Sequence, residues 1–530
     1  MMYFCLNPTR IMKAVVIVMF FLPVFCLAQV KSVDSLEQKH LNWYNLHPDS
    51  DNVMGTGTNK VWTELPERRT PKKTIIVAVI DSGIDIDHDD LKESIWTNED
   101  EIPNNKIDDD RNGFVDDVHG WNFIGNDKGE NINYENMEFT RIYRAGPSHP
   151  DFDRAKKAYL AEVAKRKTEK SNLEEFEKAY IKAKKVIWYG TGITVNSLKE
   201  MDPIPLDASQ DVLAAKRWLV SRYELGFSDE MLQQLKKNNS EYFDYFLNVS
   251  FDPRKTIGDN PEVMDGIYGN PDVEGPRADH GTAVAGVIAA VRNNGIGIDG
   301  IAPHVKIMCL RSTPRGDERD KDVANAIRYA VDNGAHIVNM SFGKPFSPEK
   351  HLVDEAVKYA EQKNVLLVHG AGNDARNIDL EPSFPNDAYL DKVEATNWIT
   401  VGASGASIDE TLPAVFSNYG KKHVDIFAPG VNIISLDSGN TYNMVDGTSL
   451  ASPVVAGVAA LILSYHPELT PAQLIDVLLL SATKMDKGKV LIPGFEEERK
   501  KTRLKDLSKS GGVVNAYEAL KKADELYTRN

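Results

Sequence analysis

Three side chains that together can perform nucleophilic catalysis stand beside apolar stretches of this chain. Asp81 follows the β-branched run 74–80. His280 and Ser449 each precede a run of small and apolar residues. In such a set the serine hydroxyl attacks a carbonyl carbon, the imidazole takes its proton and returns it to the leaving amine, and the carboxylate holds the imidazole. An amide at Asn373, on a glycine turn, can donate to the oxyanion that forms.

Each of these residues also has a plainer explanation. Ser449 is a good N-cap for the helix that follows it, with Pro453 in the first turn. Asp81 before a glycine-containing turn, and His280 at a helix start, are both common in purely structural roles. Because four suitable residues occur in one chain, we favour catalysis. At a helix start, moreover, free N–H groups and the helix dipole stabilise negative charge.

The segments around these residues alternate between strand-like and helix-like patterns. Apolar runs predict strands buried on both faces at 74–80, 305–310, 335–340, 365–369, 398–403 and 424–430. Helices are expected at 279–290, 322–333, 348–363, 470–481 and 514–527, and after Ser449. This alternation predicts an α/β fold, a three-layer sandwich with a central, mostly parallel sheet and its site at the carboxyl ends of the strands.

The stretch from about residue 126 to residue 257 has a different composition. Lys, Glu and Ala dominate it, and apolar residues recur at three- and four-residue steps, which is typical of amphipathic helices. Helices are expected near 173–187, 212–223 and 242–247. We interpret 127–257 as a mainly helical insertion without a catalytic motif, and hypothesise that it limits substrate access or guides folding.

An acidic loop follows the first predicted strand. Oxygen-bearing side chains alternate from residue 108 to residue 112, a glycine follows, and two more aspartates come soon after. This spacing matches the first half of a calcium loop, although the terminal glutamate of a helix–loop–helix site is replaced by His119. The sequence predicts bound Ca²⁺, and a solvated acidic turn is the alternative. The predicted ligands are Asp108, Asp110, Asn112, Phe114 and Asp116.

The net charge of the chain limits its possible partners, and the N-terminal residues indicate the compartment in which the protein acts. The formal net charge of −16 over 530 residues argues against nucleic acid as a partner. Arg10 and Lys13 precede the apolar run 14–27, and Ala28 suits cleavage, so a signal peptide is expected. Cleavage would leave no membrane span and export the protein to the periplasm or the exterior. An uncleaved anchor is the alternative.

Of the three cysteines, only Cys309 lies beyond the predicted cleavage site. An intrachain disulfide is therefore not expected. The strand-like run 305–310 around this residue favours a buried, apolar thiol over a nucleophile.

Three motifs resemble those of the subtilisin-like serine peptidases. They are Val79-Ile80-Asp81-Ser82-Gly83, His280-Gly281-Thr282 with Val284-Ala285-Gly286, and Gly447-Thr448-Ser449 with Ala451-Ser452-Pro453. The resemblance covers about 74–117 and 279–517. It implies a subtilisin-like fold, a triad of Asp81, His280 and Ser449, and Asn373 as the oxyanion donor. It also implies substrate-binding residues, which are Ser341, Phe342, Gly343, Gly370, Ala371 and Gly372.

The patterns together predict a domain organisation and a function. We expect a signal peptide at 1–28, an N-terminal extension at 29–73, a peptidase domain at 74–126 and 258–530, and the insertion at 127–257. The predicted function is that of a secreted serine endopeptidase, a hydrolase that acts on proteins or peptides through an acyl-enzyme. A catalytically silent peptide-binding protein and an esterase are the alternatives. The sequence does not set the cleavage preference or the oligomeric state.

Overall fold

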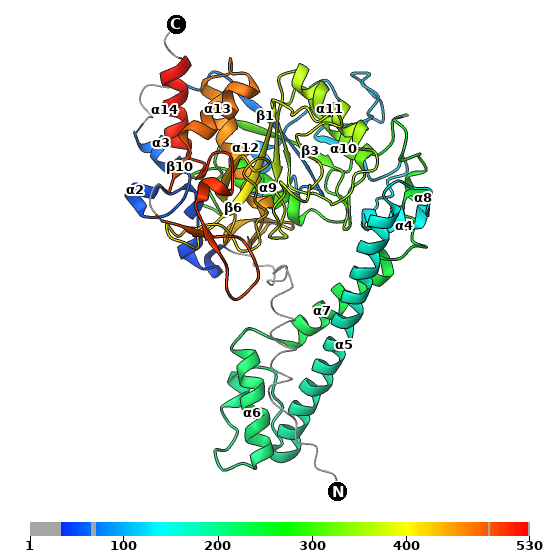
Figure 1. The fold of residues 1–530 in the computed structure, drawn as a ribbon, viewed down its shortest axis with the longest axis vertical. Helices are drawn as coiled ribbons and strands as arrows, with labels where there is room; N and C mark the ends of the chain where they lie inside the picture. The colour runs from blue at the N-terminus through cyan, green and yellow to red at the C-terminus, as the bar shows by residue number, and fades with distance from the viewer. Residues whose placement is uncertain (1–32, 65–69, 265, 486–487, 528–530) are drawn as a thin grey trace. The chain divides into compact units, whose positions relative to one another are not determined.

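A nine-stranded sheet is the central element of the structure (Figure 1). The computed structural model describes residues 33–64, 70–264, 266–485 and 488–527, so the predicted signal peptide lies outside the described residues. The strand order is β10-β13-β7-β6-β5-β4-β1-β3-β2, and every neighbouring pair is parallel except β10 with β13. The strands are β1 Ile75–Asp81, β2 Gly120–Asn122, β3 Val305–Arg311, β4 Ile337–Met340, β5 Leu366–Gly370, β6 Trp398–Ser404, β7 Ile426–Pro429, β10 Thr483–Lys484 and β13 Gly512–Val513.

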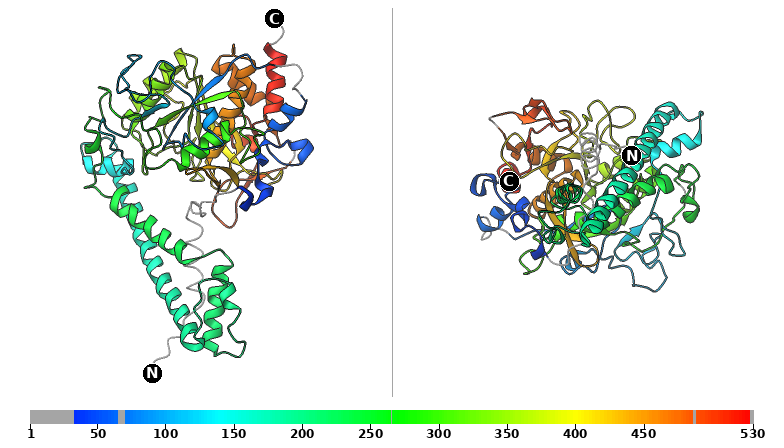
Figure 2. Two further views of the ribbon diagram at one scale, coloured as in Figure 1. Left: turned by 180° about the vertical axis from the view of Figure 1, so that it is seen from behind. Right: turned by 90° about the horizontal axis from the view of Figure 1, so that it is seen from below.

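Helices cover both faces of this sheet (Figures 1 and 2). Along β1, Val77 and Val79 pack into one hydrophobic cluster with helices α9 (Asp279–Ala289) and α12 (Thr448–Tyr465). The alternate residues Ala78 and Ile80 pack into a second cluster with α10 (Asp320–Asp332) and α11 (Lys350–Gln362). Side chains of a strand alternate between faces, so both faces are buried. The predicted three-layer α/β fold is confirmed.

The remaining elements of this unit are short helices, peripheral helices and two hairpins. The helices are α2 Pro48–Asp51, α3 Thr58–Glu64, α8 Arg254–Ile257, α13 Pro471–Ser481 and α14 Ala516–Tyr527. The hairpins pair β8 Ile433–Asp437 with β9 Thr441–Val445, and β11 Val490–Leu491 with β12 Lys501–Thr502. The β8–β9 hairpin directly precedes α12 and was not predicted.

Every residue of α12 is buried. Within the part of the chain that the structure describes, it is the one helix long and apolar enough for a membrane span, and it lies wholly inside the core. Gly447 is the N-cap of this helix and Pro453 is its sixth residue, so the alternative with Ser449 as N-cap and the proline in the first turn is wrong. In β3, Cys309 is fully buried, and burial raises the pKa of its thiol, as expected for a structural cysteine.

The described residues fall into two compact units, and 139–251 form the smaller one. It contains nearly all of α4 (Glu138–Ala145), with α5 (Phe152–Thr191), α6 (Gln210–Tyr223), α7 (Asp229–Glu241) and the π-helix η7 (Tyr242–Phe246). Within this unit α5 packs against α6 and α7 (Figures 1 and 2). The predicted helix 173–187 lies in the C-terminal half of the 40-residue α5, whereas α4 and α7 were not predicted.

The larger unit holds the two ends of the predicted insertion together. Asn122 and Asn270 exchange backbone hydrogen bonds of 3.0 and 3.2 Å. The Asn126 amide also donates to the carbonyl of Thr256 at 2.9 Å. Residues 127–138 and 252–257 therefore belong to the larger unit, so the separate helical unit is shorter than the stretch 127–257.

Candidate active site

Asp81 ends β1 and is almost fully buried. Its Oδ1 accepts hydrogen bonds from the Ser82 N–H and from Nδ1 of His280, each at 2.7 Å. Its Oδ2 is buried and has no hydrogen-bond partner among the described residues. A carboxylate accepts only, so the imidazole must carry its proton on Nδ1, which leaves Nε2 as a base.

His280 is the second residue of α9, and the start of this helix is packed tightly against the end of β1. A Cβ on Gly281 would come within 2.1 Å of the Gly83 carbonyl oxygen, so only glycine fits this approach. Burial lowers the pKa of the His280 imidazole, but the Asp81 carboxylate outweighs that effect and the net pKa is raised above its usual value.

Ser449 is the second residue of α12 and is 6% exposed. Its carbonyl accepts a hydrogen bond of 2.9 Å from the hydroxyl of Ser341. Its own N–H finds no acceptor among the described residues. This free donor at a helix start is suited to stabilising an oxyanion.

Asn373 is held in place by the residue before Ser449. Its Oδ1 accepts from the Thr448 N–H at 2.9 Å and from the Thr448 hydroxyl at 3.0 Å, so Nδ2 is left as a donor. A Cβ on Gly447 would lie 2.7 Å from Ser449 Oγ and 3.6 Å from Asn373 Nδ2. The hydroxyl and the amide therefore flank the same glycine, and a side chain there would collide with the hydroxyl.

The residues that the resemblance assigns to substrate binding lie on two neighbouring segments. The Phe342 carbonyl accepts a 2.7 Å hydrogen bond from Nε2 of His369, whose pKa is lowered to about 4 by burial. The Gly372 N–H donates to the Thr448 hydroxyl at 3.0 Å. Ala371 is buried beside a cavity of about 200 Å³. The hydrogen bond from His369 to the Phe342 carbonyl was not predicted, because nothing in the sequence shows which carbonyl the imidazole contacts.

Comparison with known proteins decides the family. The pattern of the subtilase family matches residues 72–495, which is most of the chain. This chain belongs to the subtilase family. A thermophilic serine proteinase from Bacillus sp. (strain AK1) is 42% identical over 187 residues, which are 35% of this chain and 42% of that protein.

Other relatives of this subtilase are subtilisins. Subtilisin Savinase from Lederbergia lenta is 35% identical over 225 residues, 42% of this chain and 77% of its own length. Subtilisin E from Bacillus subtilis (strain 168) is 39% identical over 207 residues, 38% of this chain and 50% of its own. The AK1 proteinase and subtilisin E are thus matched over half of their length or less. A solved cold adapted subtilisin-like serine proteinase is 28% identical, with a TM-score of 0.36, over 47% of this chain and 76% of its own.

The predicted calcium loop gathers a different set of carboxylates from the one expected. Glu101, Asp110 and Asp117 each bring an oxygen within 4.8 Å of the others. Asp108 instead accepts from backbone N–H groups of residues 112 and 113, and Asp116 from those of residues 105 and 106. Of the predicted ligands, only Asp110 belongs to this group. The distant Glu101 could not be found from the loop spacing.

The chemistry of this group suits calcium. All three side chains offer oxygen, which Ca²⁺ prefers. Burial raises the pKa of Glu101 and of Asp117, and the neighbouring carboxylates add to both increases. A divalent cation would relieve this repulsion. In the present arrangement the amides of Asn98 and Asn112 donate to both Asp110 and Asp117 at 2.9–3.0 Å.

Proposed function

We propose that this subtilase is an exported serine endopeptidase that cleaves proteins or peptides through an acyl-enzyme. The observation that carries the proposal is the 2.7 Å hydrogen bond between His280 Nδ1 and Asp81 Oδ1 at the carboxyl end of a central strand. Family membership supports the same conclusion.

Each step of the reaction has a residue of this chain to perform it. Ser449 Oγ bonds to the carbonyl carbon of the substrate while Nε2 of His280 takes the hydroxyl proton. The Ser449 N–H and Asn373 Nδ2 donate to the resulting oxyanion. His280 then protonates the leaving nitrogen as the C–N bond breaks, which leaves an acyl-enzyme. Water, deprotonated by His280, attacks the ester carbonyl, and the proton returns to Ser449 Oγ as the acid is released.

Labelling with a fluorophosphonate tests this proposal. The wild-type chain should be labelled at Ser449 and should cleave peptide substrates, whereas Ser449→Ala should do neither. Ser464→Ala, a buried serine later in the same helix, is the matched control and should behave as wild type. Peptide binding without labelling or cleavage would indicate a silent binding protein. Labelling with ester turnover but no peptide cleavage would indicate an esterase.

Export rests on the signal-like segment 1–28. Expression with this segment should yield a protein that begins at Gln29 and is recovered from the periplasm or the medium. Intact-mass measurement of the exported protein tests the cleavage site. Recovery of the uncleaved chain in the membrane fraction would contradict it.

We also propose that Glu101, Asp110 and Asp117 hold a structural Ca²⁺. Bound calcium would stabilise the loop by offsetting three converging negative charges. Calcium should raise the Tm of the wild-type protein and raise it less in Asp117→Asn. Asp116→Asn is the control, because Asp116 faces backbone N–H groups and not this group. An equal calcium effect in all three proteins would refute the site.

A further inference from the structure

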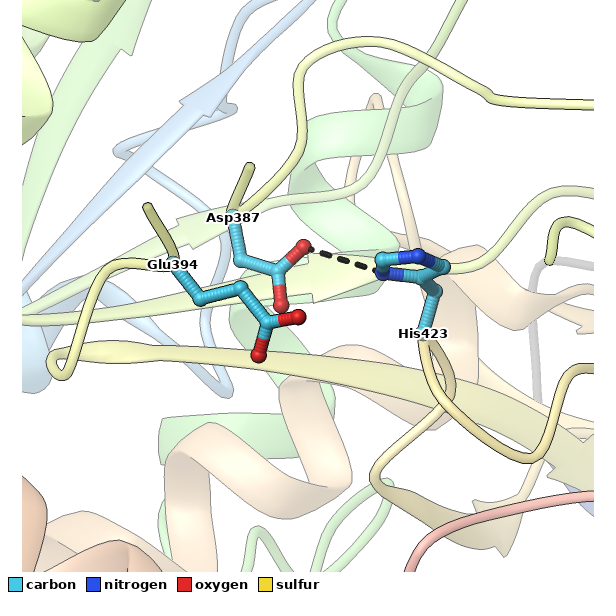
Figure 3. A group of neighbouring side chains, drawn as sticks. All are labelled: Asp387, Glu394 and His423. Carbon is cyan, nitrogen blue, oxygen red and sulfur yellow. Dashed lines mark ion pairs between the residues drawn. The ribbon is translucent and has the colours of Figure 1, made fainter. Parts of the chain in front are cut away.

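A second cluster of metal-ligating side chains lies away from both sites described above. Asp387, Glu394 and His423 each offer an atom within 4.8 Å of the others (Figure 3). Asp387 is buried, His423 is half-buried and Glu394 is exposed. His423 Nδ1 lies 3.4 Å from Asp387 Oδ1, and this is the ion pair drawn in Figure 3.

The backbone presents these side chains from two loops. Residues 387–395 form a hairpin-like turn, in which the Tyr389 N–H donates to Val393 O and the Ala395 N–H donates to Asp387 O, both at 2.8 Å. This turn carries Asp387 and Glu394 on its two arms. The third residue comes from the loop before β7, where the His423 N–H donates to Asp379 Oδ1 at 3.0 Å. Two separately braced loops thus converge on one point.

The charges around this point leave an excess of carboxylates. Lys509 Nζ lies 2.9 Å from Asp425 Oδ1 and 3.7 Å from Asp387 Oδ2. Its ammonium group is therefore closest to Asp425. Asp387 therefore has only the more distant contact with this lysine, besides its contact with His423, and Glu394 adds a second carboxylate at the same point. A dication at this point would balance two carboxylates directly.

We propose that Asp387, Glu394 and His423 bind a divalent transition-metal ion, with zinc as the best fit. Imidazole nitrogen with two carboxylates is a typical zinc donor set, whereas calcium takes oxygen ligands. Donors that bind zinc at about 2.0–2.1 Å lie roughly 3.3 Å apart, so the exposed Glu394 side chain needs a small rotation to close the site. Asp387 and His423 both line the cavity of about 200 Å³, which gives a remaining ligand position access to water.

The site would connect the metal to a segment beside the predicted substrate-binding residues 341–343. Phe384, three residues before Asp387, pairs with Lys344 through two backbone hydrogen bonds of 2.8 and 2.9 Å. Lys344 directly follows Gly343. A metal that fixes the 387–395 turn therefore stabilises a neighbour of residues 341–343, so its main effect should be on stability.

Metal titration of the chelator-treated full-length protein tests this site. Isothermal titration with ZnCl₂ should show one tight site, and Co²⁺ at that site should give a visible absorption band. His423→Ala and Glu394→Gln should each weaken zinc binding by roughly tenfold or more and remove the cobalt band. Because Glu394 is exposed, Glu394→Gln should fold normally. Lys509→Met should strengthen zinc binding, since it removes a competing cation.

The controls separate this site from the calcium loop and from other histidines. Asp117→Asn should leave zinc binding unchanged, and Glu394→Gln should leave the calcium effect on Tm unchanged. Zinc binding that persists in both His423→Ala and Glu394→Gln would place the metal elsewhere and overturn the proposal. So would the absence of zinc binding to wild type, which would make the cluster an ion-pair network only.

Discussion

The hydroxyl of Ser341 donates a hydrogen bond of 2.9 Å to the backbone carbonyl of Ser449. In an unbroken helix that carbonyl would accept from the N–H four residues later, but residue 453 is a proline and has no N–H. Ser341 directly follows β4. It therefore replaces a missing helical donor and ties the turn that carries the proposed nucleophile to the central sheet.

Ser341→Ala should destabilise the protein and lower kcat, because the buried Ser449 carbonyl loses its donor. Leaving such a group unpaired costs about 1–3 kcal/mol. Pro453→Ala restores an N–H at the helical position, so the Ser341→Ala loss should be smaller in that background. Urea unfolding and steady-state kinetics of the four proteins measure the coupling. Equal losses in both backgrounds would contradict the replacement.

Asn373→Ala should lower kcat by about 10²–10³ with little change in KM, because Nδ2 acts only on the oxyanion. This magnitude is the one known for removing one oxyanion-hole amide in subtilisin, and the position of Asn373 beside Thr448 and Ser449 is the reason to expect it here. Asn373→Asp, which keeps the shape but lacks the N–H donor, should lose as much. A rise in KM with unchanged kcat would assign Asn373 to ground-state binding instead.

On the acidic side of the pH–activity profile, which we call the acid limb, the pH at which activity falls should depend on the charges around His280. The base must be neutral, so activity falls as pH drops through its raised pKa. Asp279 raises this pKa and Arg277 lowers it. Asp279→Asn should therefore move the limb of kcat/KM to lower pH, and Arg277→Gln should move it to higher pH. If the limb shifted in the same direction in both variants, a group other than His280 would determine the pH at which kcat/KM falls.

Lys344 should be one of the most sensitive charged residues of the larger unit. Its buried ammonium lies 2.7 Å from Glu138 Oε2, 2.9 Å from Asp320 Oδ1 and 2.7 Å from the Glu318 carbonyl. Lys344→Met would remove the positive charge that lies against these buried carboxylates and should cost about 3–5 kcal/mol in the free energy of unfolding.

The matched control for Lys344 is the exposed pair of Lys92 with Asp89, at 2.6 Å. Lys92→Ala should change stability far less than Lys344→Met, because solvent screens the pair. Urea unfolding of both variants tests the contrast. A similar small cost for Lys344→Met would show that its carboxylate partners find other donors.

The sequence located the strands and the proposed catalytic residues because those depend on local patterns. Asp81 was expected at the end of a strand, and β1 does end there. His280 and Ser449 were expected at helix starts, and each is the second residue of its helix. An apolar run followed by a polar residue and a glycine is visible without knowledge of the fold.

Side chains whose roles depend on distant partners could not be predicted. The hydroxyl of Ser341 faces a carbonyl 108 residues away, and its function arises from a proline in another element. Asp110 lies in a group of carboxylates with Glu101 and Asp117, and neither of these two belongs to the predicted ligand set. In the helical unit, α7 is polar overall, and its three apolar residues, Met231, Leu232 and Leu235, were too few to mark it as a helix.

The smaller unit, residues 139–251, should fold by itself, because it has its own hydrophobic core. Tyr180 and Ile187 of α5 pack there with Leu219 of α6, which is fully buried. The isolated fragment should be helical by circular dichroism and melt cooperatively. Leu219→Ala should cost about 2–5 kcal/mol, whereas Leu206→Ala, at a residue 90% exposed, should cost almost nothing. A gradual melt, or equal effects of the two substitutions, would show that this core depends on the rest of the chain.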